Sequence, residues 1–289
     1  MTRKLSLFVI AALLSCAPAA HATFKGGNGR VAYDVTSKGI GDDGSATAYR
    51  AVATVQPDGR ADRFLRECQQ NAGKTVDGDC AIEYRTPTWR PDGKQLAFDA
   101  GKQLALIGST GAGFSLLPAV TADDSQPAFS PSGRQLAFAG AGGIYVYDLR
   151  ARRARRIVRG GSDPDFSSRN RIAFERGGSI YSATASGKDV KRVAAGRDPG
   201  WSGSGKSLIL ARKGGIYTVG ADGKGLDRVV RCSRCAAPVF SPNGKLFAYD
   251  APGVTVAQLS NGRKVATLVQ DFSGGGESFD GSSPAWARR

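Results

Sequence analysis

Short apolar runs bounded by Gly, Pro, Asp or Ser recur along the chain from residue 29 to the C-terminus. Three of them share a longer pattern, which reads PTWRPDGKQLAF at 87–98, PAFSPSGRQLAF at 127–138 and PVFSPNGKLFAY at 238–249. In the last two copies Pro occupies the second turn position and Gly the fourth, which is the preference of a type I turn. The aromatic residue before the turn and the apolar residues after it therefore predict two strands joined by a tight turn.

Weaker copies of the pattern begin at Pro164 and Pro199, so that the five leading prolines are 40, 37, 35 and 39 residues apart. A third apolar run follows each copy, as in GIYVY at 143–147, and a fourth precedes the next proline, as in RIV at 156–158. Four short strands in a repeat of about 40 residues are the signature of a β-propeller blade.

The two ends of the chain complement each other. The segment before the first full copy supplies strands at 29–33, 47–52 and 62–66 but lacks a first strand, and the chain ends on a half-copy from Pro284 to Trp286. Pairing the two completes a sixth blade and removes an open sheet edge. We therefore predict an all-β fold, a single six-bladed β-propeller of four-stranded blades over residues 23–289, closed by the strand around Trp286.

Residues 1–22 have the three parts of a secretory signal peptide: a basic start, an apolar stretch from Leu5 to Leu14, and a small-residue end at 20–22. The sequence thus predicts export to the periplasm, the cell surface or the extracellular space. The alternative is a lipoprotein signal, LLSC at 13–16, in which Cys16 carries the lipid. Leu14 fits that signal poorly, so cleavage after Ala22 is favoured, and membrane attachment is expected only if Cys16 is lipidated.

The repeat resembles that of the TolB-type six-bladed propellers, whose WD-like pattern is Pro-x-Trp-Ser-Pro-Asp-Gly-Lys/Arg-x-apolar-Ala-Phe. The resemblance covers essentially the whole mature chain. TolB itself has an additional N-terminal domain, for which this sequence leaves no room. The resemblance implies an exported TolB-like propeller rather than a component of the Tol-Pal system.

The net charge and the histidine content exclude several classes of function. The chain has 40 Lys and Arg against 25 Asp and Glu, a net charge of +15. Export removes Arg3 and Lys4 and no acidic residue, which leaves about +13. The single histidine, His21, lies in the signal peptide. Ser-His-Asp and Cys-His nucleophile systems and His-ligated metal sites are thereby excluded from the mature chain, which favours binding over catalysis.

The segment GWSGSGKS at 200–207 matches the phosphate-binding P-loop pattern. A P-loop runs from a strand into a helix, whereas this segment occupies the turn of a repeat and is followed by an apolar strand at 208–210. We interpret it as a propeller turn.

Four cysteines remain after export: Cys68, Cys80, Cys232 and Cys235. In an oxidising compartment, the local pairing of Cys68 with Cys80 and of Cys232 with Cys235 is the simplest of the three connectivities. The alternatives are a redox couple at 232–235, which needs a helix N-terminus, and a four-thiolate zinc site, which has to join separate blades. We favour two structural disulfides.

A run of arginines lies at the predicted hairpin between the third and fourth strands of blade 3: Arg150, Arg152, Arg153, Arg155, Arg156 and Arg159. This density of positive charge attracts polyanions, so the run is a candidate binding surface for an anionic envelope polymer, acidic lipid head groups or an acidic protein. A solvated hairpin of a basic protein is the simpler interpretation. Nucleic acid is not expected as a partner, because export precedes any encounter and no aromatic residues interleave the arginines.

Asp124, Asp165 and Asp198 lie near the prolines that begin three blades, and we expect them to approach the propeller axis. Together they could bind Ca²⁺ through oxygen ligands or act as acid and base, although turn capping is the default role of such aspartates. The sequence otherwise predicts no cofactor and no metal.

Two functions from different classes follow. The favoured one is an exported, non-catalytic binding or scaffold protein, expected to be monomeric, that holds a protein or polyanionic partner through one propeller face or the arginine run. The alternative is a carbohydrate-active hydrolase or lyase that uses the axial carboxylates.

Overall fold

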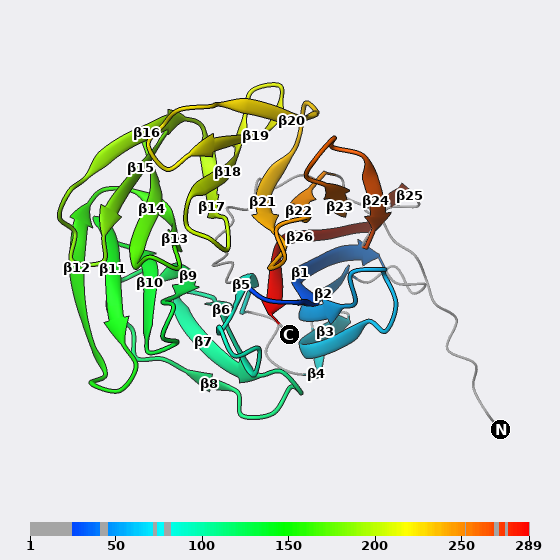
Figure 1. Ribbon diagram of the computed structural model, residues 1–289. Coiled ribbons are helices and arrows are strands. Elements are labelled where there is room, and N and C mark those ends of the chain that lie inside the picture. The colour runs from blue at the N-terminus through cyan, green and yellow to red at the C-terminus, as the bar shows by residue number, and fades with distance from the viewer. Residues whose placement is uncertain are drawn as a thin grey trace.

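The computed structural model describes residues 25–40, 46–71, 74–77, 82–251, 253–268, 272–274 and 277–288. Its regular structure consists of strands, β1 to β26, which form six antiparallel sheets. The sheets stand around a common axis as the blades of a propeller (Figure 1), and the prediction of an all-β, six-bladed propeller is confirmed. A search of the described residues finds no helix with the length and apolarity needed to span a membrane.

Blades 2 to 6 each contain four strands in chain order, from the axis outward (Figure 1). Blade 2 contains β5 (Tyr84–Trp89), β6 (Gln95–Ala100), β7 (Gln103–Gly108) and β8 (Ser115–Leu116). Blade 3 contains β9 (Ser125–Phe129), β10 (Gln135–Gly140), β11 (Gly143–Asp148) and β12 (Arg153–Arg159). Blade 4 contains β13 (Ser162–Phe166), β14 (Arg171–Arg176), β15 (Ser179–Thr184) and β16 (Lys191–Ala195). Blade 5 contains β17 (Arg197–Trp201), β18 (Ser207–Arg212), β19 (Gly215–Gly220) and β20 (Asp227–Arg231). Blade 6 contains β21 (Ala236–Phe240), β22 (Leu246–Asp250), β23 (Val254–Gln258) and β24 (Lys264–Thr267).

Blade 1 joins the two ends of the chain. Its central strands are β26 (Glu277–Arg288), β1 (Asn28–Ile40), β2 (Ala46–Val55) and β3 (Arg63–Asn71), with β25 (Phe272–Gly274) and β4 (Lys74–Asp77) at its edges. Val31 in β1 is paired with Trp286 in β26, and the buried Trp286 side chain donates its Nε1–H to the carbonyl oxygen of Gly29 at 3.2 Å. The predicted closure of the ring by the C-terminal strand is confirmed.

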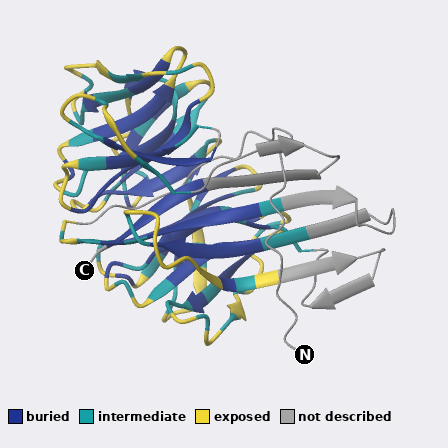
Figure 2. Ribbon diagram, turned by 90° about the vertical axis from the view of Figure 1, so that its right-hand side faces the viewer, coloured by how far each residue is buried: buried dark blue, intermediate teal, exposed yellow. Residues whose placement is uncertain are grey.

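The hydrophobic core lies between neighbouring blades. The inner strands of blades 2 to 6 each end in a buried aromatic side chain, such as Phe166 in blade 4, and this ring packs against side chains of the preceding blade, such as Ile144 in blade 3. Figure 2 shows the buried strands surrounded by exposed turns. Complete burial of one such side chain contributes about 2 to 3 kcal/mol, so blade-to-blade packing is the main source of stability.

The turns between the third and fourth strands, hereafter the outer turns, also join the blades. Five of them have a glycine with positive φ that lies toward the outer strand of the preceding blade: Gly59, Gly111, Gly187, Gly223 and Gly262. A Cβ on Gly187 would lie 2.0 Å from the carbonyl oxygen of Ile157, so only glycine fits there. Blade 3 departs from the pattern, because the residue with positive φ in its outer turn is Arg152.

The P-loop-like segment at 200–207 is the turn between β17 and β18. The N–H of Gly205 donates to the carbonyl oxygen of Ser202 at 2.8 Å, and strand β18 follows directly. Because no helix follows, the backbone N–H groups are not arranged around a helix N-terminus as phosphate binding requires. The interpretation as a propeller turn is confirmed.

Candidate functional site

A ring of six residues surrounds the axis where the inner strands begin, and each of them precedes the proline of its repeat. We call it the axial ring: Thr86, Gln126, Asp163, Asp198, Ala237 and Ser283. All six have φ between 48° and 58°, a left-handed conformation that non-glycine residues rarely adopt. All six are also buried. The repeated conformation directs the backbone N–H of the axial residue toward the preceding blade.

Acidic side chains of the preceding blade accept these N–H groups. Asp34 in β1 accepts from Thr86 at 3.3 Å, and Asp99 in β6 accepts from Gln126 at 2.6 Å. Asp198 of the axial ring itself accepts from Ala237 at 3.1 Å. A hydrogen bond in a folded protein contributes about 0.5 to 1.5 kcal/mol, so these carboxyl groups help to hold neighbouring blades together near the axis.

Between blades 3 and 4 the acceptor is an amide. The Oε1 atom of Gln126 accepts the N–H of Asp163 at 2.9 Å, and the Nε2 atom of Gln126 donates to Oδ1 of Asp163 at 2.8 Å. This two-bond contact holds the Asp163 carboxyl group in one orientation.

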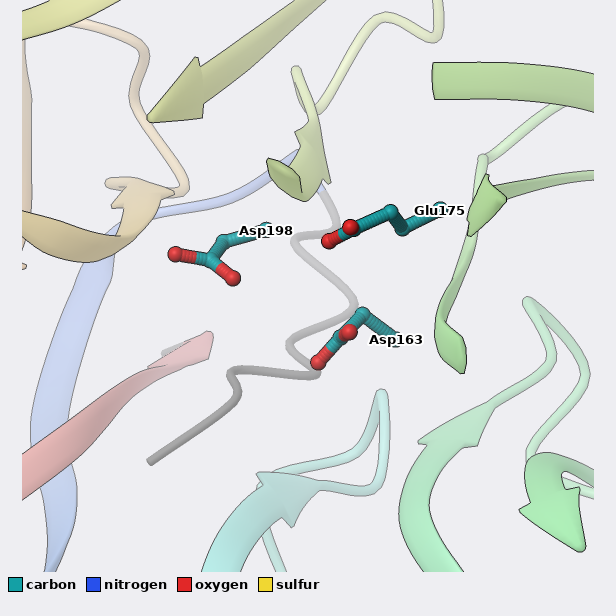
Figure 3. Close-up of side chains that lie close together, drawn as sticks. All are labelled: Asp163, Glu175 and Asp198. Atoms are coloured by element: carbon teal, nitrogen blue, oxygen red, sulfur yellow. The ribbon is translucent and has the colours of Figure 1, made fainter. Parts of the chain in front are cut away.

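Asp163, Glu175 in β14 and Asp198 form what we call the axial cluster, in which one carboxyl oxygen of each residue lies within 4.8 Å of those of the other two (Figure 3). Burial raises the pKa of Asp163 well above its usual value, and the nearby Asp198 raises it further. Burial likewise raises the pKa of Asp198, although Arg197, 3.2 Å away, acts in the opposite direction. The half-buried Glu175 also has a raised pKa, from burial and then from Asp198. The cluster therefore retains protons at a pH where exposed carboxyl groups have lost them.

The three aspartates named from the sequence do not form this cluster together. Only Asp198 belongs to it. Asp124 caps its own loop, since its carboxylate accepts the N–H groups of Val120 at 2.6 Å and Thr121 at 2.9 Å. Asp165 is buried and accepts the N–H of Trp201 from the next blade at 2.6 Å. The expectation that the three converge is corrected, because the side chains of Asp124 and Asp165 serve turn capping and blade packing.

Glu175 was missed by sequence reasoning, although a signal for its position exists. An acidic residue directly follows the aromatic residue of the second strand in four of the six blades, namely Asp34, Asp99, Glu175 and Asp250. Repetition of this pair at one place in the repeat predicts that the acidic residues share a level near the axis. Carboxylates are the oxygen ligands that Ca²⁺ prefers, but Ca²⁺ takes six to eight ligands, which is more than three carboxyl groups supply one by one. Ca²⁺ binding therefore stays a prediction.

The six arginines of the run lie on β12 and its outer turn, which together we call the arginine strand. All six are exposed: Arg150, Arg152, Arg153, Arg155, Arg156 and Arg159. None of them forms an ion pair with a carboxylate of the described residues. Arg155 alone is anchored on the next blade, where its guanidinium donates to the carbonyl oxygens of Ala185 at 2.9 Å and Ser186 at 3.5 Å.

The carboxylate nearest in register is already occupied. Asp148 is paired with Arg153 across the hairpin, but its Oδ1 accepts the N–H groups of Ala151 at 2.8 Å and Arg150 at 3.0 Å. The bond from Ala151 lowers the pKa of Asp148, with a smaller contribution from Arg150. The Asp148 carboxylate thus caps the turn and forms no ion pair with the neighbouring arginine side chains.

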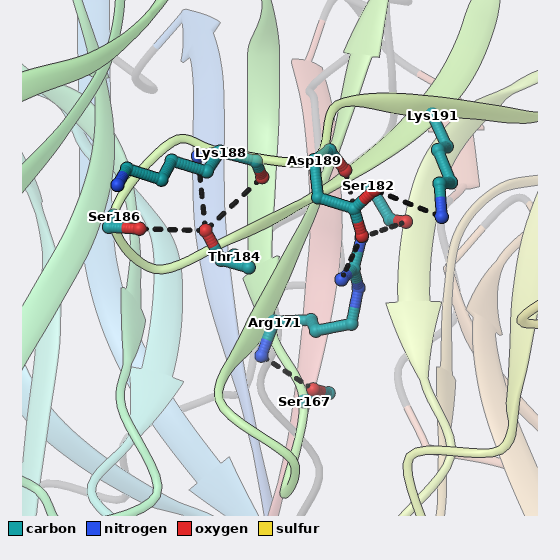
Figure 4. Close-up of polar contacts among 8 residues, drawn as sticks. All are labelled: Ser167, Arg171, Ser182, Thr184, Ser186, Lys188, Asp189 and Lys191. Carbon is teal, nitrogen blue, oxygen red and sulfur yellow. Dashed lines mark hydrogen bonds and ion pairs between the residues drawn. The ribbon is translucent and has the colours of Figure 1, made fainter.

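Blade 4 shows the usual arrangement of surface bases (Figure 4). Asp189 lies 2.9 Å from both Arg171 and Lys191, and these two partners lower its pKa. Blade 4 therefore neutralises two of its bases with one carboxylate, whereas the six arginines of blade 3 have no carboxylate partner among the residues that the structure describes.

The disulfide predicted between Cys232 and Cys235 is present in the segment that joins β20 to β21. The carbonyl oxygen of Cys235 accepts from Arg197 at 3.1 Å, so the disulfide segment contacts a side chain that also reaches Asp198. Cys80 and Cys16, like the signal peptide at 1–22, lie outside the described residues, and the pairing of Cys68 with Cys80 stays a prediction.

Comparison with known proteins identifies solved structures of similar fold. No family model matches the sequence, and no curated protein matches it. Among solved structures, TolB from Acinetobacter baumannii is 18% identical, with a TM-score of 0.66 over 90% of this chain and 67% of TolB. A chain of the nidogen–laminin complex is 8% identical, with a TM-score of 0.64 over 89% of this chain and 98% of that one. A gluconolactonase from Xanthomonas campestris is 18% identical, with a TM-score of 0.53 over 65% of this chain and 76% of that one. The chain therefore has a TolB-like six-bladed β-propeller fold.

Proposed function

We propose that this protein is an exported, non-catalytic propeller that binds a polyanionic partner along the arginine strand. The observation that carries the proposal is the row of six exposed arginines without a carboxylate partner in the described part of the chain. Neighbouring side chains on one side of a strand are about 7 Å apart, at which distance like charges repel. A bound polyanion would remove that repulsion and gain charge-assisted hydrogen bonds from the guanidinium groups.

Blade packing does not account for the arginines. The other five outer turns each have a glycine oriented toward the preceding blade, and blade 3 has Arg152 at this position. The outer strand of the preceding blade, β8, has only two residues, so it provides a short surface for the turn of blade 3. The arginine strand is thus a local departure from the repeat, which supports a role in binding.

The fold is compatible with this role. A chain of similar fold belongs to the nidogen–laminin complex, and TolB shares the same architecture. The signal peptide predicted at 1–22 and the disulfide of Cys232 with Cys235 support export to an oxidising compartment.

Binding of polyphosphate and of poly-glutamate to the purified protein tests the proposal by calorimetry. The test variant replaces four arginines of β12 with Gln: Arg153, Arg155, Arg156 and Arg159. The matched control replaces four exposed bases of the other outer hairpins with Gln: Lys188, Lys224, Arg228 and Arg263. We expect the β12 variant to lose at least tenfold more affinity than the control. Equal losses would contradict the proposal, because binding would then follow net charge and not the arginine strand.

The alternative, a carbohydrate-active hydrolase or lyase, depends on axial carboxylates. Asp163 and Asp198 of the axial cluster are buried and engaged in bonds between blades, and Glu175 is the more accessible member. Turnover of a sugar lactone or a glycan that is abolished by Glu175→Gln would favour the alternative over binding.

A further inference from the structure

We propose that one whole face of the propeller docks onto a membrane surface rich in anionic phospholipid head groups. The face is formed by the outer turns together with the inner turns, which join the first and second strands of blades 2 to 6. Because successive strands in a blade are antiparallel, both kinds of turn lie at the same end of the blade. We call this end the turn face, and the proposal extends beyond the arginine strand to a separate set of bases.

Each of the five inner turns exposes a basic side chain. These residues are Lys94, Arg134, Arg169, Lys206 and Lys245. The one acidic residue in the five turns is Asp92, and Arg90 of the same turn lies 3.6 Å from it. The inner turns therefore form a ring of positive charge around the axis.

Contacts between neighbouring inner turns hold the ring together. Arg169 of blade 4 donates its Nε–H to the carbonyl oxygen of Ser204 in the inner turn of blade 5, at 3.2 Å. A Cβ on Gly133 would lie 2.8 Å from Nε of Arg90, so the turns of blades 2 and 3 also touch. The basic side chains thus extend from a fixed, continuous surface.

The start of the described chain occupies the sixth place in the ring. The N–H of Gly26 donates to the carbonyl oxygen of Pro242, and Oδ1 of Asn28 accepts from Asn243, each at 3.2 Å. Pro242 and Asn243 belong to the inner turn of blade 6. The adjacent Lys25 is exposed and adds a base at this place.

A ring of bases on one face fits a planar anionic surface. Such a surface meets all the inner-turn bases at once, whereas a linear polymer meets only those along its path. At the opposite end of blades 2 to 6, only two of the five turns between the second and third strands contain a base, Lys102 and Lys213. That end therefore offers fewer bases to anionic head groups than the inner turns do. The asymmetry predicts one orientation of the propeller on the membrane.

Cosedimentation of the purified protein with vesicles tests this proposal. One set of vesicles is pure phosphatidylcholine, and the other contains equal parts of phosphatidylcholine and phosphatidylglycerol. The test variant replaces four inner-turn bases with Gln: Lys94, Arg134, Lys206 and Lys245. The matched control replaces four exposed bases at the opposite end of the blades with Gln: Lys102, Lys213, Arg231 and Arg234.

We expect binding to the phosphatidylglycerol vesicles alone, with loss of binding when salt is raised from about 0.1 M to about 1 M. Each base near an anionic surface is worth about a fivefold change in partition, so the inner-turn variant should bind several hundredfold more weakly. The control variant should lose far less. Equal loss in both variants, or wild-type binding to polyphosphate without binding to vesicles, would overturn the proposal.

Vesicle binding also separates this proposal from the proposed function. The β12 variant still has the four inner-turn bases that the inner-turn variant lacks. It should therefore keep most of its vesicle binding while it loses its binding to polyphosphate. If the β12 variant loses vesicle binding and the inner-turn variant keeps it, the arginine strand and not the turn face is the membrane contact, and the inference is wrong.

Discussion

Replacement of Asp99 by Asn should change how the stability of the propeller depends on pH. Asp99 is buried near the end of β6, and its carboxyl group accepts the N–H of Gln126 across the boundary between blades 2 and 3. Burial raises the pKa of Asp99 from 3.8 to about 8, against the opposing effect of its hydrogen bonds. Asparagine retains the oxygen that accepts this bond but has no proton to lose.

The magnitude follows from the difference in pKa between the folded and unfolded states. Below about pH 4, Asp99 is protonated in both states and the free energy of unfolding is insensitive to its ionisation. Between about pH 4 and pH 8 the unfolded chain releases the proton while the folded propeller holds it, so stability falls as pH rises. One pH unit corresponds to about 1.4 kcal/mol, which gives a total loss of about 5 kcal/mol at pH 8.

Urea unfolding followed by circular dichroism at pH 5, 6, 7 and 8 measures the effect, at about 25 °C. The wild-type protein should lose stability steadily over this range, and the Asp99→Asn variant should lose several kcal/mol less than the wild type between pH 5 and pH 8. Asp123→Asn, at an exposed position, is the control and should keep the wild-type slope. A wild-type stability that is constant or rises toward pH 8, or a wild-type slope in Asp99→Asn, would refute the reasoning.

Three further predictions concern stability and are checked by the same urea titration. Gly187→Ala should destabilise the protein by at least about 2 kcal/mol more than Gly225→Ala. Both glycines have positive φ, but only Gly187 has a backbone oxygen 2.0 Å from the new Cβ. Equal losses of stability would mean that the positive φ alone determines the cost. Joint replacement of Cys232 and Cys235 by Ser should cost about 2 kcal/mol, since the disulfide closes a short loop, and addition of a reductant to the wild type should reproduce the loss. Trp286→Ala should cost about 3 to 5 kcal/mol and make blade 1 more sensitive to limited proteolysis, and a normal proteolysis pattern would show that the closing strand holds without its tryptophan.

The architecture was predictable because each blade repeats the same local requirements. A tight turn needs Pro and Gly at set positions, and a buried inner strand needs an aromatic residue before that turn, as Trp89 and Phe129 show. These demands act within about 12 residues of one another, so one sequence displays them several times over. The half-copy that ends at Trp286 indicated the closure of the ring for the same reason.

The axial cluster was less predictable because its members come from three strands of two neighbouring blades. Asp163 precedes a proline, Glu175 ends the next strand, and Asp198 belongs to the following repeat. The local sequence does not predict the distance between their carboxyl groups, since that distance depends on the rotation between neighbouring blades. Asp124 shows the converse case. Its position near a proline predicted a place near the propeller axis, but its carboxylate accepts hydrogen bonds from N–H groups of its own loop.

The arginine strand combines both kinds of information. Its composition, position in blade 3 and hairpin location follow from the repeat and the order of residues alone. Its six side chains are exposed and form no ion pair within the described part of the chain. That depends on which carboxylates lie within reach, and the Asp148 carboxylate is engaged in capping its own turn. Local periodicity thus specifies the blades and their number, because strands and turns form from neighbours in sequence. The packing of one blade on the next decides which charges are buried, paired or left for a partner, because those distances join residues of separate repeats.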